Sequence, residues 1–240
     1  MNKKAVEMLY EGAKRFGIQL SDEQVTMFRS YSSMLKERNK VVNLTAITED
    51  EDIAVKHFLD SLTLYPYIQE LKGKSLVDIG TGAGFPGIPL KIVCPDLKIT
   101  LVDSLIKRVA FLNDVVDELG LKDINAIHAR AEEIGKNKEH RERYDFATAR
   151  AVAQMPVLLE YCIPLVKVNG YFLAMKGAKE EDNYEKALEV LGGIFYKKEF
   201  LELEKDDEVI QRIIYIFKKD KKTSTNYPRK PGVPTKKPLI

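Results

Sequence analysis

The sequence predicts an α/β fold in which helices flank a doubly wound, mostly parallel sheet. From residue 75 onward, short apolar strand patterns alternate with amphipathic helix patterns, as in parallel strands joined by right-handed crossovers. A glycine-rich turn follows the first strand, and two longer strand patterns near the end of the chain form a hairpin. Together these observations predict a Rossmann-like, seven-stranded sheet with one antiparallel strand and an N-terminal helical extension.

The residues before the first strand are expected to be helical. Ser21 and Gln24 form a capping-box signature, after which apolar residues recur at helical spacing. Thr48 and Glu51 form a second such signature before another helical pattern. No Gly/Ser-rich linker separates this segment from the strands, so we expect a cap of helices that packs on the main domain.

Seven segments are expected to be strands because they are apolar, rich in β-branched or aromatic residues, and bounded by glycine or acidic residues. They are Ser75–Ile79, Lys98–Val102, Ile124–His128, Tyr144–Ala149, Gly170–Met175, Gly193–Leu203 and Glu208–Phe217. A helix that Gly120 terminates is expected between the second and third strands, and another is expected near Asp182–Leu191. The short connection between the last two strands predicts an antiparallel edge.

Charge is unevenly distributed along the chain. From Lys218 to Ile240 there are eight basic residues and one acidic residue, whereas acidic residues outnumber basic ones in the remainder. We therefore predict three parts: a helical cap at 1–70, a Rossmann-like domain at 71–219 and a basic, proline-rich tail at 220–240. The tail is expected either to contact a polyanionic partner or to be a solvated run of charge.

Composition excludes several classes of protein. The content of 45% hydrophobic and 31% charged residues is that of an ordinary soluble protein, and no apolar run approaches the roughly 18–20 residues that span a bilayer. The first residues lack a signal-peptide pattern, so a cytoplasmic location is expected. Cys94 and Cys162 lie in apolar contexts that predict burial, and the three histidines show no metal-ligand spacing.

The glycine-rich turn is the most informative motif of the chain. It runs Asp78-Ile79-Gly80-Thr81-Gly82-Ala83-Gly84-Phe85-Pro86-Gly87. The acidic residue Asp78 lies at the end of the strand, and the glycines allow the backbone to approach a bound molecule closely. The next strand is followed by Asp103, where a carboxylate can accept hydrogen bonds from ribose hydroxyls. The pair predicts a nucleoside-binding crevice, whereas a glycine-rich turn alone could serve packing.

The spacing of the glycines favours S-adenosylmethionine over a dinucleotide. A dinucleotide-binding turn places glycine-x-glycine-x-x-glycine directly after the strand. In this chain that spacing occurs only as Gly82, Gly84 and Gly87, which begins two residues later than Gly80. If the motif is counted from Gly80, the place of its third glycine is occupied by Phe85. The acid that closes the strand would repel a pyrophosphate but suits a cationic sulfonium or amino group. The turn is therefore typical of class I S-adenosylmethionine-dependent methyltransferases, whose product is S-adenosylhomocysteine.

Further candidate residues follow the other strands. Ser104 follows the second strand, and Ala131 with Glu132 follows the third, where they could hold adenine or cap a helix. Arg150 follows the fourth strand, where a buried charge is costly unless it is paired. It could pair with a carboxylate or present its guanidinium to a substrate, and Lys176 at the end of the fifth strand is similar.

Two absences bear on the methyl acceptor. The fourth strand is not followed by an acid or asparagine and two prolines, the arrangement that binds an exocyclic amino group. It is also not followed by a cysteine, which would be needed for attack on a pyrimidine carbon. A nitrogen with a free lone pair, such as guanine N7, needs no base. Catalysis then reduces to aligning the methyl group, the sulfur and the nucleophile.

These motifs together resemble the bacterial 16S ribosomal RNA guanine-N7 methyltransferase family, also called glucose-inhibited division protein B. The likeness covers nearly the whole chain and includes Asn43-Leu44-Thr45, His57-Phe58-Leu59-Asp60-Ser61, Asp78 to Pro86, Val102-Asp103-Ser104, Arg130-Ala131-Glu132, Thr148 to Ala153, Lys176-Gly177 and Tyr227 to Gly232. It implies one guanine of the decoding-region loop as the target. Family members commonly have alanine where this chain has Thr81.

The resemblance and the residues together give a candidate site. Cofactor-binding residues are expected to be Asp78, Gly80, Gly82, Gly84, Phe85, Asp103, Ser104, Ala131, Glu132 and Arg150. Arg150 and Lys176 are the catalytic candidates, and Arg229 and Lys230 are expected to contact RNA. The expected partner is 16S rRNA or a small-subunit precursor, with no membrane, no metal and a monomeric state. The competing hypotheses are a small-molecule methyltransferase, a non-catalytic RNA-binding module and a nicotinamide dehydrogenase.

Overall fold

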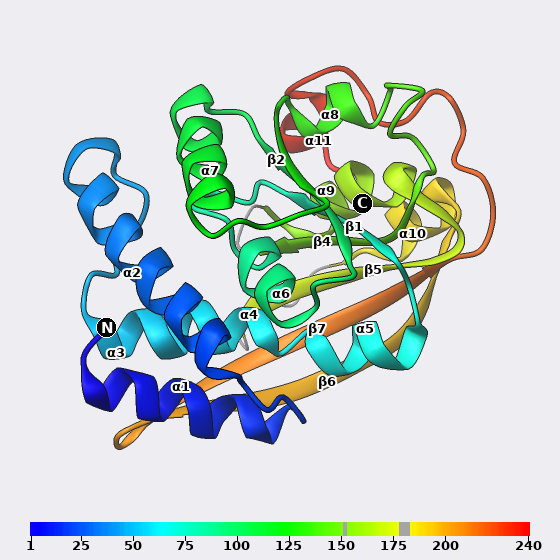
Figure 1. Ribbon diagram of the computed structural model, residues 1–240. Helices are drawn as coiled ribbons and strands as arrows, with labels where there is room; N and C mark the ends of the chain where they lie inside the picture. Colours follow the sequence, from blue (N-terminus) through cyan, green and yellow to red (C-terminus); the bar gives the residue numbers. More distant parts are fainter. Residues whose placement is uncertain (151–152, 178–182) are drawn as a thin grey trace.

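A seven-stranded sheet forms the centre of the molecule in a computed structural model that describes residues 1–150, 153–177 and 183–240 (Figure 1). The strands are β1 (Ser75–Ile79), β2 (Lys98–Asp103), β3 (Ile124–His128), β4 (Tyr144–Arg150), β5 (Val166–Gly177), β6 (Gly193–Lys205) and β7 (Glu208–Lys219). Their order is β3-β2-β1-β4-β5-β7-β6, and β7 runs antiparallel to both of its neighbours. This arrangement confirms the predicted fold class.

Helices cover both faces of the sheet (Figure 1). One face carries α1 (Lys3–Arg15), α2 (Asp22–Val42), α3 (Asp50–Asp52), the π-helix η1 (Ile53–Leu59), α4 (Asp60–Leu62), α5 (Tyr65–Leu71), α6 (Gly87–Val93) and α7 (Ile106–Glu118). The other carries α8 (Ala131–Ile134), α9 (Met155–Cys162), the 3₁₀ helix η2 (Ile163–Leu165), α10 (Glu185–Leu191) and α11 (Val233–Lys236). Alternate strand residues therefore fall into two hydrophobic clusters, one on each face.

The N-terminal helices share a hydrophobic cluster with the sheet. Phe28 and Tyr31 of α2 and Phe58 of η1 are fully buried in the same cluster as Leu76 of β1. The Ser21–Gln24 capping box is present, as predicted. The box predicted at Thr48 and Glu51 is absent, because the helix begins at Asp50 with Glu49 as its N-cap; Glu51 accepts a hydrogen bond from the side chain of Asn2. The division of the chain into three parts stays a prediction.

Two sequence predictions fall partly outside the described residues. The motif residues 151 and 152 lie outside them, as does residue 182, where the last predicted helix was expected to begin. None of the helices within the described ranges combines the length and the apolar character that a membrane crossing requires.

Candidate functional site

Two cavities lie at the carboxyl ends of the parallel strands. The first, here called the loop cavity, measures about 260 Å³ and is lined by residues that follow β1, β2 and β3. These include five of the predicted cofactor-binding residues: Gly80, Asp103, Ser104, Ala131 and Glu132. The second, here called the arginine cavity, measures about 360 Å³ and is lined by side chains that include Arg150, Lys176 and Arg212. The sequence thus predicted residues of both cavities.

The glycine-rich turn is held in place from two sides. Gly80 N and Thr81 N both donate hydrogen bonds to Val102 O, at 2.9 and 3.1 Å, which fixes the turn to the end of β2. From the other side, the buried Tyr31 hydroxyl of α2 donates to Ala83 O. The N-terminal helices therefore help to shape the turn.

Gly82 and Gly84 are glycines for different reasons. Both have positive φ, at 62° and 103°. A Cβ on Gly84 would lie 2.5 Å from Ile88 Cδ1 and 2.7 Å from Tyr31 Oη, whereas a Cβ on Gly82 would meet no atom within 4 Å. Gly82 N also donates to Asp103 Oδ2 at 3.0 Å. Gly84 thus allows close packing, while Gly82 leaves open space on its side of the turn.

Asp78 is a buried carboxylate with one unpaired oxygen. Its Oδ2 accepts hydrogen bonds from Thr81 Oγ1 at 2.7 Å and from Gly87 N at 2.9 Å. Among the described residues, its Oδ1 is one of two buried side-chain oxygens without a hydrogen-bond partner. Burial raises the pKa of Asp78 to about 6, against the opposing effects of the two hydrogen bonds and of Arg150. An orphaned carboxylate oxygen beneath a nucleoside-type turn fits a cationic ligand group.

Asp103 forms part of the wall of the loop cavity, but its oxygens are already engaged. Oδ1 accepts from Leu105 N at 2.9 Å, and Oδ2 accepts from Gly82 N at 3.0 Å and from Arg108 at 3.4 Å. Only 3% of Asp103 is exposed. A carboxylate offers about four acceptor positions, so one position remains for a ligand hydroxyl.

Glu132 faces the loop cavity, while its neighbour caps the helix. Glu133 accepts a hydrogen bond from Arg130 N at 3.1 Å, which satisfies the N-terminus of α8. Glu132 is buried, and its Oε1 accepts instead from Gly232 N at 2.8 Å and from the Tyr161 hydroxyl at 3.4 Å. The helix-capping alternative therefore applies to Glu133, and Glu132 remains a cavity residue.

Arg150 pairs with a carboxylate, which is one of the two alternatives that the sequence left open, and contact with a substrate stays a prediction. Its Nη1 donates to Asp60 Oδ2 at 2.7 Å and to Lys56 O at 3.1 Å, so it is paired with a carboxylate. Its guanidinium also lies over the ring of Phe85, 5.0 Å from the ring centroid, and lines the arginine cavity. Arg150 therefore connects the glycine-rich turn to the arginine cavity.

Asp60 holds two arginines at this cavity. Besides Arg150 on Oδ2, it accepts from Arg212 Nε on Oδ1 at 2.7 Å, and only 2% of Asp60 is exposed. Sequence reasoning assigned no role to Asp60 or Arg212. The available sequence signal was the spacing of Asp60 three residues after His57, about one helical turn. The structure adds that Asp60 directly follows a π-helix, a geometry that is frequent at functional sites.

His57 is a neutral side chain that lines the arginine cavity. Its ring stacks on Phe85 with the centroids 4.4 Å apart. An arginine can only donate, so Nδ1 accepts from Arg150 at 3.2 Å and Nε2 carries the proton that it donates to Thr45 Oγ1 at 2.8 Å. Burial, followed by the charge of Arg150, lowers the pKa of His57 to about 3.

Replacing His57 with glutamine is expected to make the protein less sensitive to acid. The folded pKa of about 3 lies below the ordinary 6.5, so between these values the unfolded chain binds a proton that the folded protein does not. The free energy of unfolding therefore falls as the pH is lowered through this window, by up to about 1.4 kcal/mol per pH unit. Urea unfolding of both proteins across the window checks this.

The difference between the pH profiles of the wild-type and His57→Gln proteins gives the contribution of His57 alone. Asp78 has the opposite effect, because its folded pKa of about 6 lies above 3.8, but it is present in both. Glutamine keeps one acceptor and one donor for Arg150 and Thr45. Parallel pH profiles for the two proteins would contradict a neutral, buried His57.

Lys176 connects the two cavities. It lines the arginine cavity, is 6% exposed, and donates from Nζ to Ala153 O at 2.9 Å. Ala153 in turn lines the loop cavity. The two predicted catalytic candidates, Arg150 and Lys176, therefore lie in one cavity.

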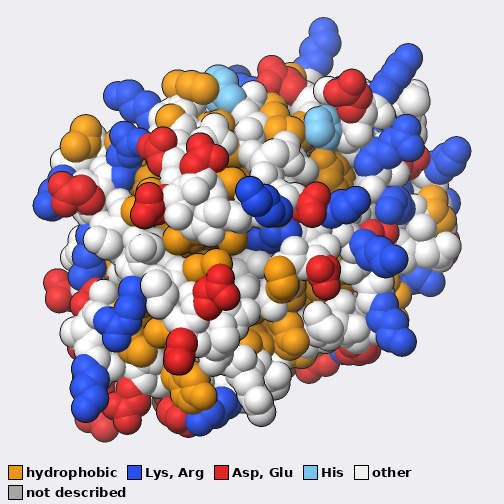
Figure 2. All heavy atoms as spheres, in the orientation of Figure 1, with side chains coloured by type: hydrophobic (Ala, Val, Ile, Leu, Met, Phe, Trp, Pro, Cys, Tyr) orange, Lys and Arg blue, Asp and Glu red, His pale blue; other side chains and the backbone are white. Residues whose placement is uncertain are grey.

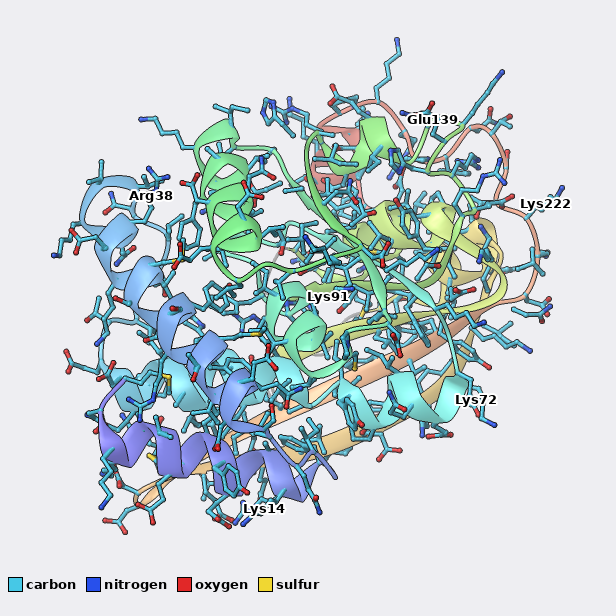
Figure 3. All side chains as sticks on the ribbon, in the orientation of Figure 1. Lys14, Arg38, Lys72, Lys91, Glu139 and Lys222 are labelled. Carbon is cyan, nitrogen blue, oxygen red and sulfur yellow. The ribbon has the colours of Figure 1, made fainter. Side chains whose placement is uncertain are left out.

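The two residues expected to contact RNA differ in their surroundings. Arg229 is bonded to the fully buried Glu160, whereas Lys230 is exposed. Lys and Arg side chains gather on the side of the molecule along which the C-terminal segment runs (Figure 2). Lys222 of that segment points away from the body, whereas Lys91 lies inside it (Figure 3). Basic residues are thus not all available to a partner.

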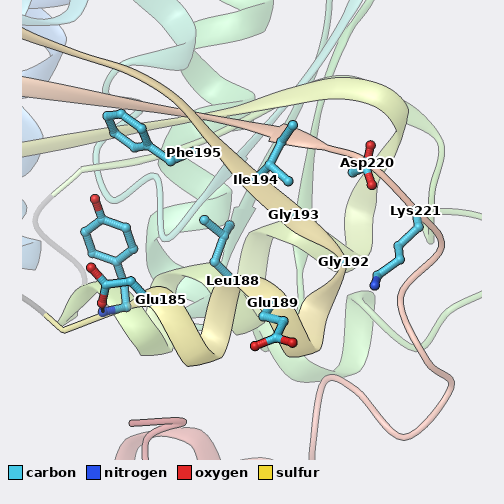
Figure 4. A pocket seen from close by; sticks show the side chains of 10 residues that line it. Glu185, Leu188, Glu189, Gly192, Gly193, Ile194, Phe195, Asp220 and Lys221 are labelled. Carbon is cyan, nitrogen blue, oxygen red and sulfur yellow. Dashed lines mark hydrogen bonds between the residues drawn. The ribbon is translucent and has the colours of Figure 1, made fainter.

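A larger hollow of about 460 Å³ lies away from this edge, between α10 and the start of β6 (Figure 4). Its lining mixes apolar side chains such as Leu188 and Phe195 with the acids Glu185 and Glu189. It contains none of the predicted site residues. Within the described parts of the chain, no group of three His, Cys, Asp or Glu side chains could hold a metal ion.

Known proteins were compared with this chain by sequence and by structure. The family model described as rRNA small subunit methyltransferase G matches residues 24–207. Curated relatives of that name include those of Acetivibrio thermocellus, 53% identical over 97% of this chain and 96% of the relative, and Alkaliphilus metalliredigens, 49% identical over 97% and 98%. Among solved structures, M. jannaschii TYW2 in complex with AdoMet is 17% identical, with a TM-score of 0.48 over 63% of this chain and 75% of that one.

Proposed function

Because this chain belongs to the rRNA small subunit methyltransferase G family and is a methyltransferase, we propose that it methylates N7 of one guanine in 16S rRNA, with S-adenosylmethionine as donor. The observation that carries the proposal is the pairing of two cavities at one sheet edge. One is a nucleoside-type cavity lined by Ile79 and Gly80, which directly follow Asp78 with its orphaned oxygen, and the other is lined by Arg150, Lys176 and Arg212.

The residues of the loop cavity and its turn fit the cofactor. Ala131 and Glu132 would hold the adenine end, and Asp103 has one acceptor position left for a ribose hydroxyl. Asp78 would face the positive charge of the sulfonium or amino group, which would give its Oδ1 a partner. When bound, S-adenosylmethionine supplies an electrophilic methyl group. Gly82 and Phe85 complete the proposed contacts.

The arginine cavity fits a guanine nucleotide. Arg150, Lys176 and Arg212 present N–H donors, which match guanine O6 and phosphate oxygens. N7 must itself remain unbonded, because its lone pair attacks the methyl group. No proton leaves before that attack, so the site needs alignment rather than a base. Arg150 and Lys176 are therefore proposed to orient the nucleotide.

The experiment combines transfer in vitro with mapping in cells. Purified protein is incubated with labelled S-adenosylmethionine and either 16S rRNA, small subunits or free guanosine nucleotides. In vitro, we expect the label in one guanine of the RNA. Mapping of rRNA from cells that lack the protein should show that the N7-methyl group is missing from the same guanine. Label in free nucleotides but not in RNA would support a small-molecule methyltransferase instead, and binding of RNA without transfer would support a non-catalytic module.

A further inference from the structure

The C-terminal segment runs from the end of β7 to the loop cavity at the carboxyl edge of the sheet. Gly232 and Thr235 line that cavity together with residues that follow β1, β2 and β3. In Figure 1 this segment, orange to red, passes over the top of the molecule and reaches α11, beside α8 and α9. The basic tail, in which Arg229 and Lys230 were expected to contact RNA, therefore borders the proposed cofactor site.

A buried ion pair anchors this segment. Glu160 of α9 is fully buried, and its two oxygens accept hydrogen bonds from Arg229 Nε at 2.9 and 3.1 Å. Arg229 Nη2 adds a bond of 2.6 Å, and the backbone N of Arg229 adds one of 2.7 Å. These bonds raise the pKa of Arg229, so the guanidinium stays charged. A bidentate, buried pair of this kind fixes position as well as charge.

A second set of bonds anchors the chain just before this pair. The guanidinium of Arg141 donates to Thr223 O, Ser224 O and Tyr227 O at distances of 2.7 to 3.0 Å. Pro228 is buried and packs so closely on Gly135 that a Cβ there would lie 2.7 Å from Pro228 Cγ. The path of the segment is therefore set before it reaches the cavity.

At the cavity, the segment contacts a predicted cofactor-binding residue directly. Gly232 N donates to Glu132 Oε1 at 2.8 Å, with Gly232 at a φ of +79°. Thr235 Oγ1 lies 3.2 Å from the Tyr161 hydroxyl, which is itself 3.4 Å from Glu132 Oε1. Glu132, Tyr161 and the segment thus form one hydrogen-bonded wall.

We propose that residues 229–235 form a wall of the cofactor-binding site, with Arg229 as the positioning residue that holds this wall against Glu160. This inference rests on the proposed function, because it takes the loop cavity as the place of the nucleoside. It assigns Gly232 and Thr235 of this segment to cofactor binding and leaves RNA contact to its exposed side chains, such as that of Lys230.

The test uses a matched pair of bulky substitutions in the full-length protein. Thr235 and Lys236 are adjacent, exposed residues of α11, but only Thr235 lines the loop cavity. Thr235→Trp is expected to raise the Kd for S-adenosylhomocysteine at least about tenfold by filling the cavity, since affinity falls with the fraction of protein able to bind. Lys236→Trp is expected to leave it unchanged. Calorimetric titration measures both.

Arg229→Ala and Arg229→Lys test the anchor. Alanine should weaken cofactor binding and raise the KM for S-adenosylmethionine more than it lowers kcat, and lysine should recover part of the loss. Affinity for a 16S rRNA fragment should stay the same in Thr235→Trp. Wild-type affinity for S-adenosylhomocysteine in Thr235→Trp would overturn the inference, as would a loss confined to RNA binding. Failure of the wild-type protein to bind S-adenosylhomocysteine would overturn the proposed function as well.

Discussion

Replacing Arg150 with alanine is expected to lower the rate of methyl transfer by at least about 100-fold, while the protein stays folded. The guanidinium bonds Asp60, the backbone at Lys56 and His57, and it lies over Phe85 of the turn. Its loss removes both the proposed contact to the nucleotide and the link between the two cavities. Single-turnover transfer to 16S rRNA measures the effect.

The fold is expected to survive because Asp60 keeps Arg212 as a partner, so no unpaired buried charge is created. Circular dichroism and urea unfolding check this. Arg150→Lys is the matched control: it keeps the charge but not the planar fork, and should recover only part of the rate. Transfer at more than about half the wild-type rate by folded Arg150→Ala protein would remove Arg150 from the proposed site.

The second large effect is expected at Gly84. An alanine there would place its Cβ 2.5 Å from Ile88 Cδ1 and 2.7 Å from Tyr31 Oη, at a φ of +103°. Backbone strain and overpacking should together lower the free energy of unfolding by about 3–5 kcal/mol. The displaced turn should also bind S-adenosylhomocysteine less tightly. Urea unfolding and calorimetric titration measure the two effects.

Gly82→Ala is the matched control in the same turn. Its Cβ would meet no atom within 4 Å, and its φ of +62° lies in the left-handed region that alanine can adopt. Only the strain remains, so the expected loss of stability is about 1–2 kcal/mol. Equal losses in the two variants would mean that the contacts of Gly84 with Ile88 and Tyr31 are unimportant.

The sheet was predictable because each strand is a short apolar block with clear ends. Ser75–Ile79 and Ile124–His128 form strands with the predicted bounds. The fifth strand begins at Val166 instead of Gly170, because Val166 pairs with Tyr144 before an irregularity in the register. The residues between are polar or exposed, so their pattern did not indicate a strand. The antiparallel edge followed from the short connection of the last hairpin.

Only some of the residues that line the arginine cavity could be predicted from the sequence. Arg150 and Lys176 lie at the carboxyl ends of two neighbouring parallel strands, so strand order places them at the same edge. Asp60 comes from a helix and lies 90 residues before Arg150 in the sequence. Arg212 comes from the antiparallel strand and lies 152 residues after Asp60. No local pattern links residues so far apart. Their meeting depends on how the N-terminal helices pack on the sheet.

The C-terminal segment shows why a run of basic residues can mislead. Lys219 and Arg229 belong to that run, yet each is bonded to a carboxylate, Glu142 and Glu160, and Lys219 is fully buried. The signal that could have indicated this was on α9. Glu160 is the one charged residue in the otherwise apolar Met155–Cys162, and a buried acid needs a partner.

The bond from Tyr31 to Ala83 has a practical consequence for dissecting the enzyme. Tyr31 and Phe58 contact Phe85 through their rings, so residues from the first quarter of the chain complete the packing of the turn. A minimal catalytic fragment cut at the start of the sheet would lack this support, however complete its strands. Truncation from the N-terminus should therefore abolish activity before it abolishes the sheet.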